Sequence, residues 1–186
     1  YNSRMINNSL PIIKNEPLAT HTTLKIGGAA EYFLAAADRD TLLSGIHASR
    51  EQDIPITLLG EGSNVLISDR GIHGLVLQNN TRTIHIGAEK DSHEKSRTAS
   101  VPARWNADKT KGTFKYDFED LDYDESDKPA VTVTIDSGAR LQPAMWYLID
   151  KGSTELQWFS GIPGTIGGAV FNNIHGGTHF MNEFIE

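Results

Sequence analysis

The stretch Leu58-Leu59-Gly60-Glu61-Gly62-Ser63-Asn64-Val65-Leu66 joins two apolar runs through a loop that has almost no side-chain bulk. Its two glycines can adopt backbone angles closed to other residues, and they let the main chain approach a ligand closely. Ser63 and Asn64 add short side chains that form hydrogen bonds. The stretch therefore predicts a loop that binds a phosphate through its backbone, without a lysine.

A second glycine-rich stretch, Gly161-Ile162-Pro163-Gly164-Thr165-Ile166-Gly167-Gly168-Ala169, follows about a hundred residues later. Either stretch alone could be a plain connection between elements, because glycine turns are common. We expect the two stretches to close around one ligand. Glu61 would repel a pyrophosphate unless its side chain points to solvent, so the contact there is assigned to the backbone.

The overall composition excludes several classes of function. The chain has 186 residues, a net charge of −7 and no cysteine. The charge argues against nucleic acid as a partner, since phosphate-backbone binding needs clustered Lys and Arg. The missing cysteines exclude disulfides, thiolate metal sites and a cysteine nucleophile. No apolar run is long enough to cross a bilayer, so we expect a cytoplasmic protein without membrane insertion. Oligomeric state stays open.

Residues 31–59 predict a strand-helix-strand unit. Residues 31–36 are typical of a strand, and 56–59 of a short buried strand. Between them a helix begins at an N-cap, Asp38 or Asp40, and ends at 52–53. Its predicted apolar face consists of Leu42, Leu43, Ile46 and His47. The first glycine loop follows the second strand, where α/β sheets commonly bind ligands.

Elsewhere the pattern is mixed. Residues 12–18 predict a loose arm. Further strands are predicted at 65–68, 74–77 and 131–135, with a turn at 69–71. A helix is predicted at 141–151, with Leu141, Met145, Leu148 and Ile149 on one face and Gly152 as its stop. Residues 165–174 can start a helix or a tight coil, and a strand is expected to begin at 184–186.

Residues 81–129 are charged and poor in aliphatic side chains, which predicts a surface excursion, with a possible hairpin at 113–116. The carboxylates of 117–127 lack the central glycine and terminal glutamate of a calcium loop, so we interpret them as a solvated acidic surface. His175 and His179 have the spacing of metal ligands on a helix, but the glycines between them oppose a helix. We therefore predict no metal site. His175 is the better candidate for a contact with an aromatic cofactor.

Taken in order, three blocks of the sequence resemble those of the UDP-N-acetylenolpyruvoylglucosamine reductases, also called UDP-N-acetylmuramate dehydrogenases. The blocks are residues 21–30, residues 59–66 and residues 161–169 followed by Asn173. The resemblance implies an α/β (α+β) fold with two FAD-binding lobes, of the type shared with vanillyl-alcohol oxidases. It places the first lobe at 1–78 and the second at 79–186, and it implies that the substrate domain and catalytic residues would lie beyond Glu186.

The resemblance also implies a set of cofactor-binding residues. The pyrophosphate contacts fall to Gly60, Gly62, Ser63 and Asn64, within a loop that includes Glu61, Val65 and Leu66. The flavin and ribityl contacts fall to Pro163, Gly164, Thr165, Gly167, Ala169 and Asn173, within a segment that includes Gly161 and Gly168. The first block usually opens with asparagine, and this chain has His21 instead.

The activity that the resemblance implies is an NADPH-dependent reduction in peptidoglycan synthesis. Hydride passes from NADPH to FAD and then to the enolpyruvyl group of a UDP-amino sugar, yielding UDP-N-acetylmuramate. The chain alone is expected to be inactive, because the catalytic residues are implied to lie beyond it. Two alternatives remain: an FAD-dependent oxidase or dehydrogenase of the same fold with another substrate, and a non-catalytic flavin-binding module.

Overall fold

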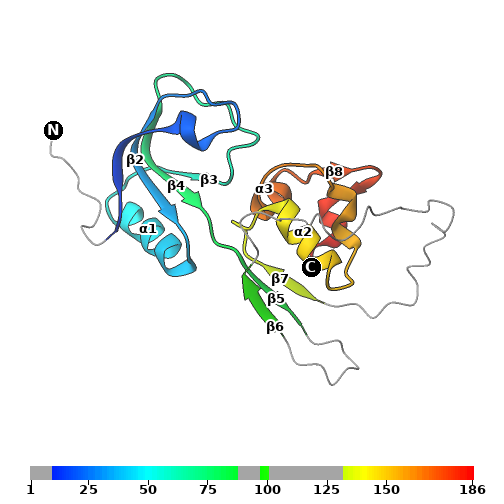
Figure 1. Cartoon of the computed structure of the whole chain (residues 1–186). Coiled ribbons are helices and arrows are strands. Elements are labelled where there is room, and N and C mark those ends of the chain that lie inside the picture. The colour runs from blue at the N-terminus through cyan, green and yellow to red at the C-terminus, as the bar shows by residue number, and fades with distance from the viewer. Residues whose placement is uncertain (1–9, 88–96, 101–131) are drawn as a thin grey trace, which may run out of the picture.

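The computed structural model of the chain describes residues 10–87, 97–100 and 132–186, which form two groups of elements side by side (Figure 1). The predicted hairpin at 113–116 and the acidic run at 117–127 lie outside the described residues. Within the described part of the chain, no helix is long and apolar enough to cross a membrane.

The first group is a four-stranded sheet with the helix α1 on one face. In spatial order the strands are β1 (Ile13–Pro17), β2 (Ala29–Ala36), β4 (Ile72–Asn79) and β3 (Ile56–Leu59). β1 runs antiparallel to β2, whereas β2 and β3 both run parallel to β4. The helix α1 (Arg39–Glu51) connects β2 to β3, and the short 3-10 helix η1 (Leu18–His21) follows β1. The predicted strand-helix-strand unit is confirmed, with β4 inserted between its strands.

Side chains of the two central strands are buried on both faces of this sheet. Leu34 and Leu77 lie with Ala48 of α1 in one apolar cluster. Phe33 and Val76 lie in a second cluster. Successive residues of a strand point to opposite faces, so a sheet covered on both sides needs a continuous apolar run, which β2 and β4 have.

The N-cap predicted at Asp38 is confirmed, because its carboxylate accepts a 2.7 Å hydrogen bond from the backbone N–H of Thr41. The predicted apolar face is partly wrong: Leu43 and His47 are exposed, and α1 approaches the sheet through small residues. A Cβ atom added at Gly45 would lie 2.7 Å from the Leu34 side chain.

Three predictions for this sheet are wrong. Residues 12–18 are not a loose arm, since β1 pairs with β2 at the sheet edge. β3 is the other edge strand rather than a buried one, and Leu58 in it is 65% exposed. Residues 65–68 form no strand; only Ile67 packs into the core, while Leu66 is 76% exposed.

The second group combines a three-stranded antiparallel sheet with short helices. The sheet order is β6 (Arg97–Ser100), β5 (Thr83–Ile86) and β7 (Val133–Ile135). After it come α2 (Leu141–Ile149), the 3-10 helix η4 (Glu155–Phe159), α3 (Ile166–Phe171), the two-residue strands β8 (His175–Gly176) and β9 (His179–Phe180), and the 3-10 helix η5 (Met181–Phe184).

The helix predicted at 141–151 is confirmed as α2, although it ends two residues earlier at Ile149, and Gly152 follows it at φ +87°. The predicted surface excursion is wrong at its start, because β5 belongs to the core and its Ile84 is fully buried with Ala144 and Leu148. The predicted strand at 184–186 is absent, since Phe184 ends η5.

The two groups meet tightly where the chain passes from β4 to β5. The Asn79 amide donates a 2.8 Å hydrogen bond to the Ser137 hydroxyl, and its oxygen accepts bonds from the backbone and side chain of Thr81. A Cβ atom at Gly138 would overlap Asn79. The predicted lobe boundary between 78 and 79 falls at the end of β4 and stays a prediction.

Candidate functional site

Hydrogen bonds from β4 and from the turn after η1 fix the position of the loop after β3. The Gln78 side-chain amide donates a 3.2 Å hydrogen bond to the carbonyl of Gly60, and the backbone N–H of Thr23 donates a 3.0 Å bond to the carbonyl of Gly62. Gly62 has φ +71°, and a Cβ atom there would overlap the carbonyl oxygen of His21. Gly62 is therefore required by close packing against the turn at 21–23, in addition to any approach of a ligand.

The second glycine stretch lies directly against this loop. The Ser63 hydroxyl donates a 3.4 Å hydrogen bond to the carbonyl of Pro163. A Cβ atom at Gly60 would lie 2.6 Å from the Thr165 hydroxyl, and one at Gly164 would lie 2.9 Å from the Ser63 hydroxyl. Two segments a hundred residues apart thus meet through the short side chains of Ser63 and Thr165 and the glycines that face them.

Within the second stretch, two predicted residues serve the local fold. The Thr165 hydroxyl caps α3 by accepting a 3.2 Å hydrogen bond from the N–H of Gly168. Gly167 packs against Ser137, whose carbonyl accepts a 2.7 Å bond from its N–H. Position 167 needs glycine because a Cβ atom there would lie 2.9 Å from Ser137.

Other predicted residues are buried in the core, bonded elsewhere or exposed. The side chain of Ala169 is buried in the core with Leu141 and Phe159. The Asn173 side chain accepts a 2.9 Å hydrogen bond from the backbone N–H of Asn182. Gly161 has φ +83° and open space around its Cα, so it serves the conformation of the turn. The side chains of Asn64, Val65 and Leu66 are exposed.

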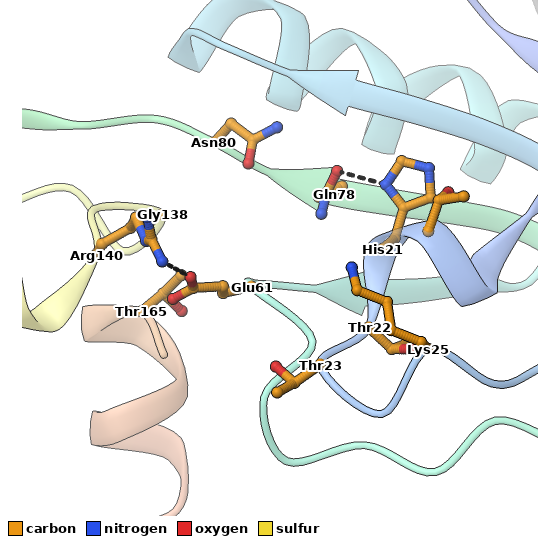
Figure 2. A pocket seen from close by; sticks show the side chains of 11 residues that line it. His21, Thr22, Thr23, Lys25, Glu61, Gln78, Asn80, Gly138, Arg140 and Thr165 are labelled. Atoms are coloured by element: carbon orange, nitrogen blue, oxygen red, sulfur yellow. Dashed lines mark hydrogen bonds and ion pairs between the residues drawn. The ribbon is translucent and has the colours of Figure 1, made fainter. Parts of the chain in front are cut away.

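A cleft of about 430 Å³ opens between the two groups of elements beside this meeting point (Figure 2). Its lining residues come from both groups, and all except Gly138 have a polar or charged side chain: Thr20, His21, Thr22, Thr23, Lys25, Glu61, Gln78, Asn80, Gly138, Arg140 and Thr165. Of the residues predicted from the sequence, Glu61 and Thr165 line it. The remaining contributors come from η1 and the turn after it, from the end of β4 and from the turn before α2.

Charges of both signs face the cleft. The Arg140 guanidinium forms an ion pair with the carboxylate of Glu61, and Figure 2 shows the two side chains meeting beside Thr165. The Glu61 carboxylate is therefore paired with a cation inside the cleft, and the assignment of its ligand contact to the backbone stays a prediction. Lys25 lines the opposite part of the cleft, and its backbone has φ +59°.

His21 links β1 to the first glycine loop. Its Nε2 lies 2.9 Å from the Glu16 carboxylate and its Nδ1 lies 3.2 Å from the Gln78 side-chain oxygen. Gln78 must present this oxygen to His21, because its amide nitrogen donates to the carbonyl of Gly60. The ring also stacks on Phe33, with centroids 4.2 Å apart. Hydrogen bonds thus run continuously from Glu16 to the glycine loop.

The histidines near the end of the chain lie outside the cleft lining. His175 contacts Phe180, with ring centroids 5.8 Å apart, while His179 bonds to Glu183 at 2.8 Å. In the part of the chain that the structure describes, no three acidic or histidine side chains gather as metal ligands would. Neither histidine lines this cleft, and contact of His175 with an aromatic cofactor stays a prediction.

Comparisons with known proteins agree with this arrangement. A family model described as "FAD binding domain" matches residues 109–186. The UDP-N-acetylenolpyruvoylglucosamine reductase of Acaryochloris marina is 34% identical over 162 residues, which are 86% of this chain and 40% of the relative. The Bacillus subtilis enzyme of the same name is 26% identical over 174 residues, 94% of this chain and 44% of the relative. The chain is similar to the N-terminal, FAD-binding portion of these reductases.

A solved structure supports the same conclusion for the fold. The crystal structure of the UDP-N-acetylenolpyruvylglucosamine reductase of Thermus caldophilus aligns with a TM-score of 0.52 at 21% identity, covering 92% of this chain and 45% of that chain. The predicted α/β fold of the FAD-binding type is confirmed. The chain spans about two fifths of the length of the reductases that it matches.

Several lining residues that the sequence did not predict, His21, Thr22, Thr23 and Lys25, lie in the block at 21–30. Its resemblance to the reductases was evident, but nothing in its composition assigned its residues to a ligand. Arg140 gave no signal, because its partner Glu61 lies far away in the sequence and only the tertiary fold brings them together.

Proposed function

We propose that this chain binds FAD, with the dinucleotide's diphosphate beside the two glycine stretches. The observation that carries the proposal is that residues 60–66 and 161–169 meet at one polar cleft. The matched family model supports FAD as the ligand. The predicted cofactor contacts of the two stretches remain part of this proposal.

The cleft fits the charged centre of such a molecule. Diphosphate oxygens need N–H donors, hydroxyls and cations, and the cleft offers Lys25, Arg140 and several threonines. The rest of the cofactor would extend along the glycine stretches on either side.

The whole protein's activity follows as a second step of the proposal. The relatives are named reductases of UDP-N-acetylenolpyruvoylglucosamine, and we propose the same NADPH-dependent reaction, forming UDP-N-acetylmuramate, for the protein that contains this chain. Bound FAD would supply the redox chemistry, while these residues hold and orient it.

The decisive experiment is a binding titration. Purified chain is mixed with FAD, and the change in flavin absorption and fluorescence is followed to saturation. A saturable complex with one FAD per chain supports the proposal. No complex at FAD concentrations far above those of the protein would refute it.

The activity of the full protein that contains this chain is tested separately, by following its consumption of NADPH. Consumption that depends on the enolpyruvyl UDP-sugar supports the reductase. Turnover of a different substrate by the flavin-loaded protein would instead favour an oxidase or dehydrogenase of the same fold.

A further inference from the structure

One ion pair joins the first glycine stretch to the residue that precedes α2. Glu61 belongs to the loop after β3, and Arg140 immediately precedes α2, next to the second stretch. Both side chains line the cleft where the proposed diphosphate would bind. A carboxylate at this position is unfavourable for an anionic ligand unless a cation neutralises it.

We propose that Arg140 is a ligand of the FAD diphosphate, and that Glu61 holds its guanidinium in place while the cleft is empty. On binding, the guanidinium passes from the Glu61 carboxylate to the diphosphate oxygens, and the carboxylate turns toward solvent. This inference rests on the proposed function, because it assumes the dinucleotide occupies this cleft.

The backbone of Arg140 is anchored at the right place for this exchange. Arg140 forms an isolated β-bridge with Thr165, and the next residue, Leu141, donates a 2.8 Å hydrogen bond to the carbonyl of Gly164. The main chain is thus fixed against the second glycine stretch. The long side chain can swing between two acceptors while its Cα stays still.

The ion pair itself is suited to being replaced. The side chains of Arg140 and Glu61 are 44% and 27% exposed, and partly exposed pairs are weak because water competes with them. A diphosphate carries more negative charge than one carboxylate, and the planar guanidinium can bond two of its oxygens at once. The exchange therefore favours the bound cofactor.

The charge of the cleft changes with the exchange. While Arg140 is paired with Glu61, Lys25 is the lining cation outside that pair. After the exchange, Arg140 and Lys25 would both face the diphosphate. His21 contacts the Glu16 carboxylate through Nε2, while its Nδ1 faces the Gln78 side chain.

The test compares four variants by their FAD dissociation constants at several salt concentrations. Arg140→Met is expected to weaken FAD binding about 10- to 100-fold, the loss typical of one charge-assisted hydrogen-bonding group, and to reduce its salt dependence. Arg140→Lys should retain part of the affinity, since it keeps charge without the planar fork. Glu61→Gln is expected to tighten binding, because it removes the competing carboxylate.

The matched control is Arg39→Met, which removes one exposed arginine outside the cleft lining. It should leave FAD affinity unchanged. Circular dichroism and thermal unfolding verify that each variant is folded. Competition by inorganic pyrophosphate gives an independent readout, and it should weaken in Arg140→Met alongside FAD.

The outcomes separate the two proposals. If the unmodified chain binds no FAD, the proposed function fails and this inference fails with it. If the unmodified chain binds FAD and a folded Arg140→Met binds equally well, only the role of Arg140 is overturned. If Glu61→Gln weakens FAD binding as strongly as Arg140→Met, the ion pair persists in the complex and the exchange is overturned.

Discussion

Gly62 and Gly152 both have positive φ, but only Gly62 is enclosed by neighbouring backbone. Gly152→Ala should destabilise the fold by about 1 kcal/mol through backbone strain alone, and it should leave FAD affinity intact. Gly62→Ala adds a clash with the turn at 21–23, so it should displace the loop and abolish FAD retention. Urea unfolding and FAD titration of both variants test this pair.

A result in which Gly62→Ala and Gly152→Ala behave alike in the FAD titration would contradict the role assigned to the turn at 21–23. Strain would then be the whole effect, since Gly152 has no atom within 4 Å of an added Cβ.

Gln78 positions the first glycine loop through the carbonyl of Gly60. Gln78→Met keeps the length of the side chain and removes both the donor to Gly60 and the acceptor for His21. We expect FAD binding to weaken about tenfold or more, because the loss of the bond to Gly60 alone has that typical effect when its partner is left unsatisfied. Gln157→Met is the control, because Gln157 is exposed in η4. Equal affinities for the two variants would rule out the positioning role.

At the scale of the elements, the start of α1 depends on an ionised side chain. Hydrogen bonds from the backbone and side chain of Thr41 hold the pKa of Asp38 below its usual range. A lowered pKa in the folded state stabilises the fold above the usual aspartate pKa of about 3.9, and that contribution is lost as pH falls toward the lowered value.

Asp38→Ala should therefore lower the unfolding temperature at pH 7, and the difference from the unmodified chain should narrow at pH 3. Asp38→Ser keeps a capping oxygen that does not ionise, so its unfolding temperature should lie between the two at pH 7. Thermal unfolding at both pH values checks this. A difference for Asp38→Ala that is as large at pH 3 as at pH 7 would exclude the ionised cap.

The elements that could be predicted from sequence are those with strong local signals. α1 has a capping aspartate, and β2 and β4 have apolar runs buried on both faces. β1 could not be predicted, because its side chains are mostly exposed at a sheet edge and show no alternation. The strand predicted at residues 65–68 was wrong because this apolar run is not buried as a strand would be: Val65 and Leu66 are exposed and only Ile67 packs into the core.

The same distinction applies to the candidate site. Glycine content and family resemblance indicated residues 60–66 and 161–169, and the structure brings these stretches together. The cleft walls depend on tertiary contacts between residues far apart in sequence, such as His21 with Gln78. Such pairs leave no local pattern, so sequence reasoning could not supply them.

At the scale of the whole molecule, FAD is proposed to contact both groups of elements at once. Binding should then slow amide hydrogen exchange in residues 60–66 and in residues 161–169 together. It should also raise stability by about 2.7 kcal/mol when FAD is present at 100 times its dissociation constant. Hydrogen-exchange mass spectrometry with and without FAD measures the first effect. Protection confined to one stretch would contradict a shared site.

The packed junction at Asn79, Thr81 and Gly138 has a consequence for how a cofactor enters. Because an added methyl group would not fit between the two groups there, they have little freedom to swing apart like the halves of a hinge. We expect a cofactor to enter by rearrangement of side chains at the cleft mouth, on the fast timescale of rotamer changes. We therefore expect the rate of uptake to depend on diffusion and on the opening of the partly exposed ion pair between Arg140 and Glu61.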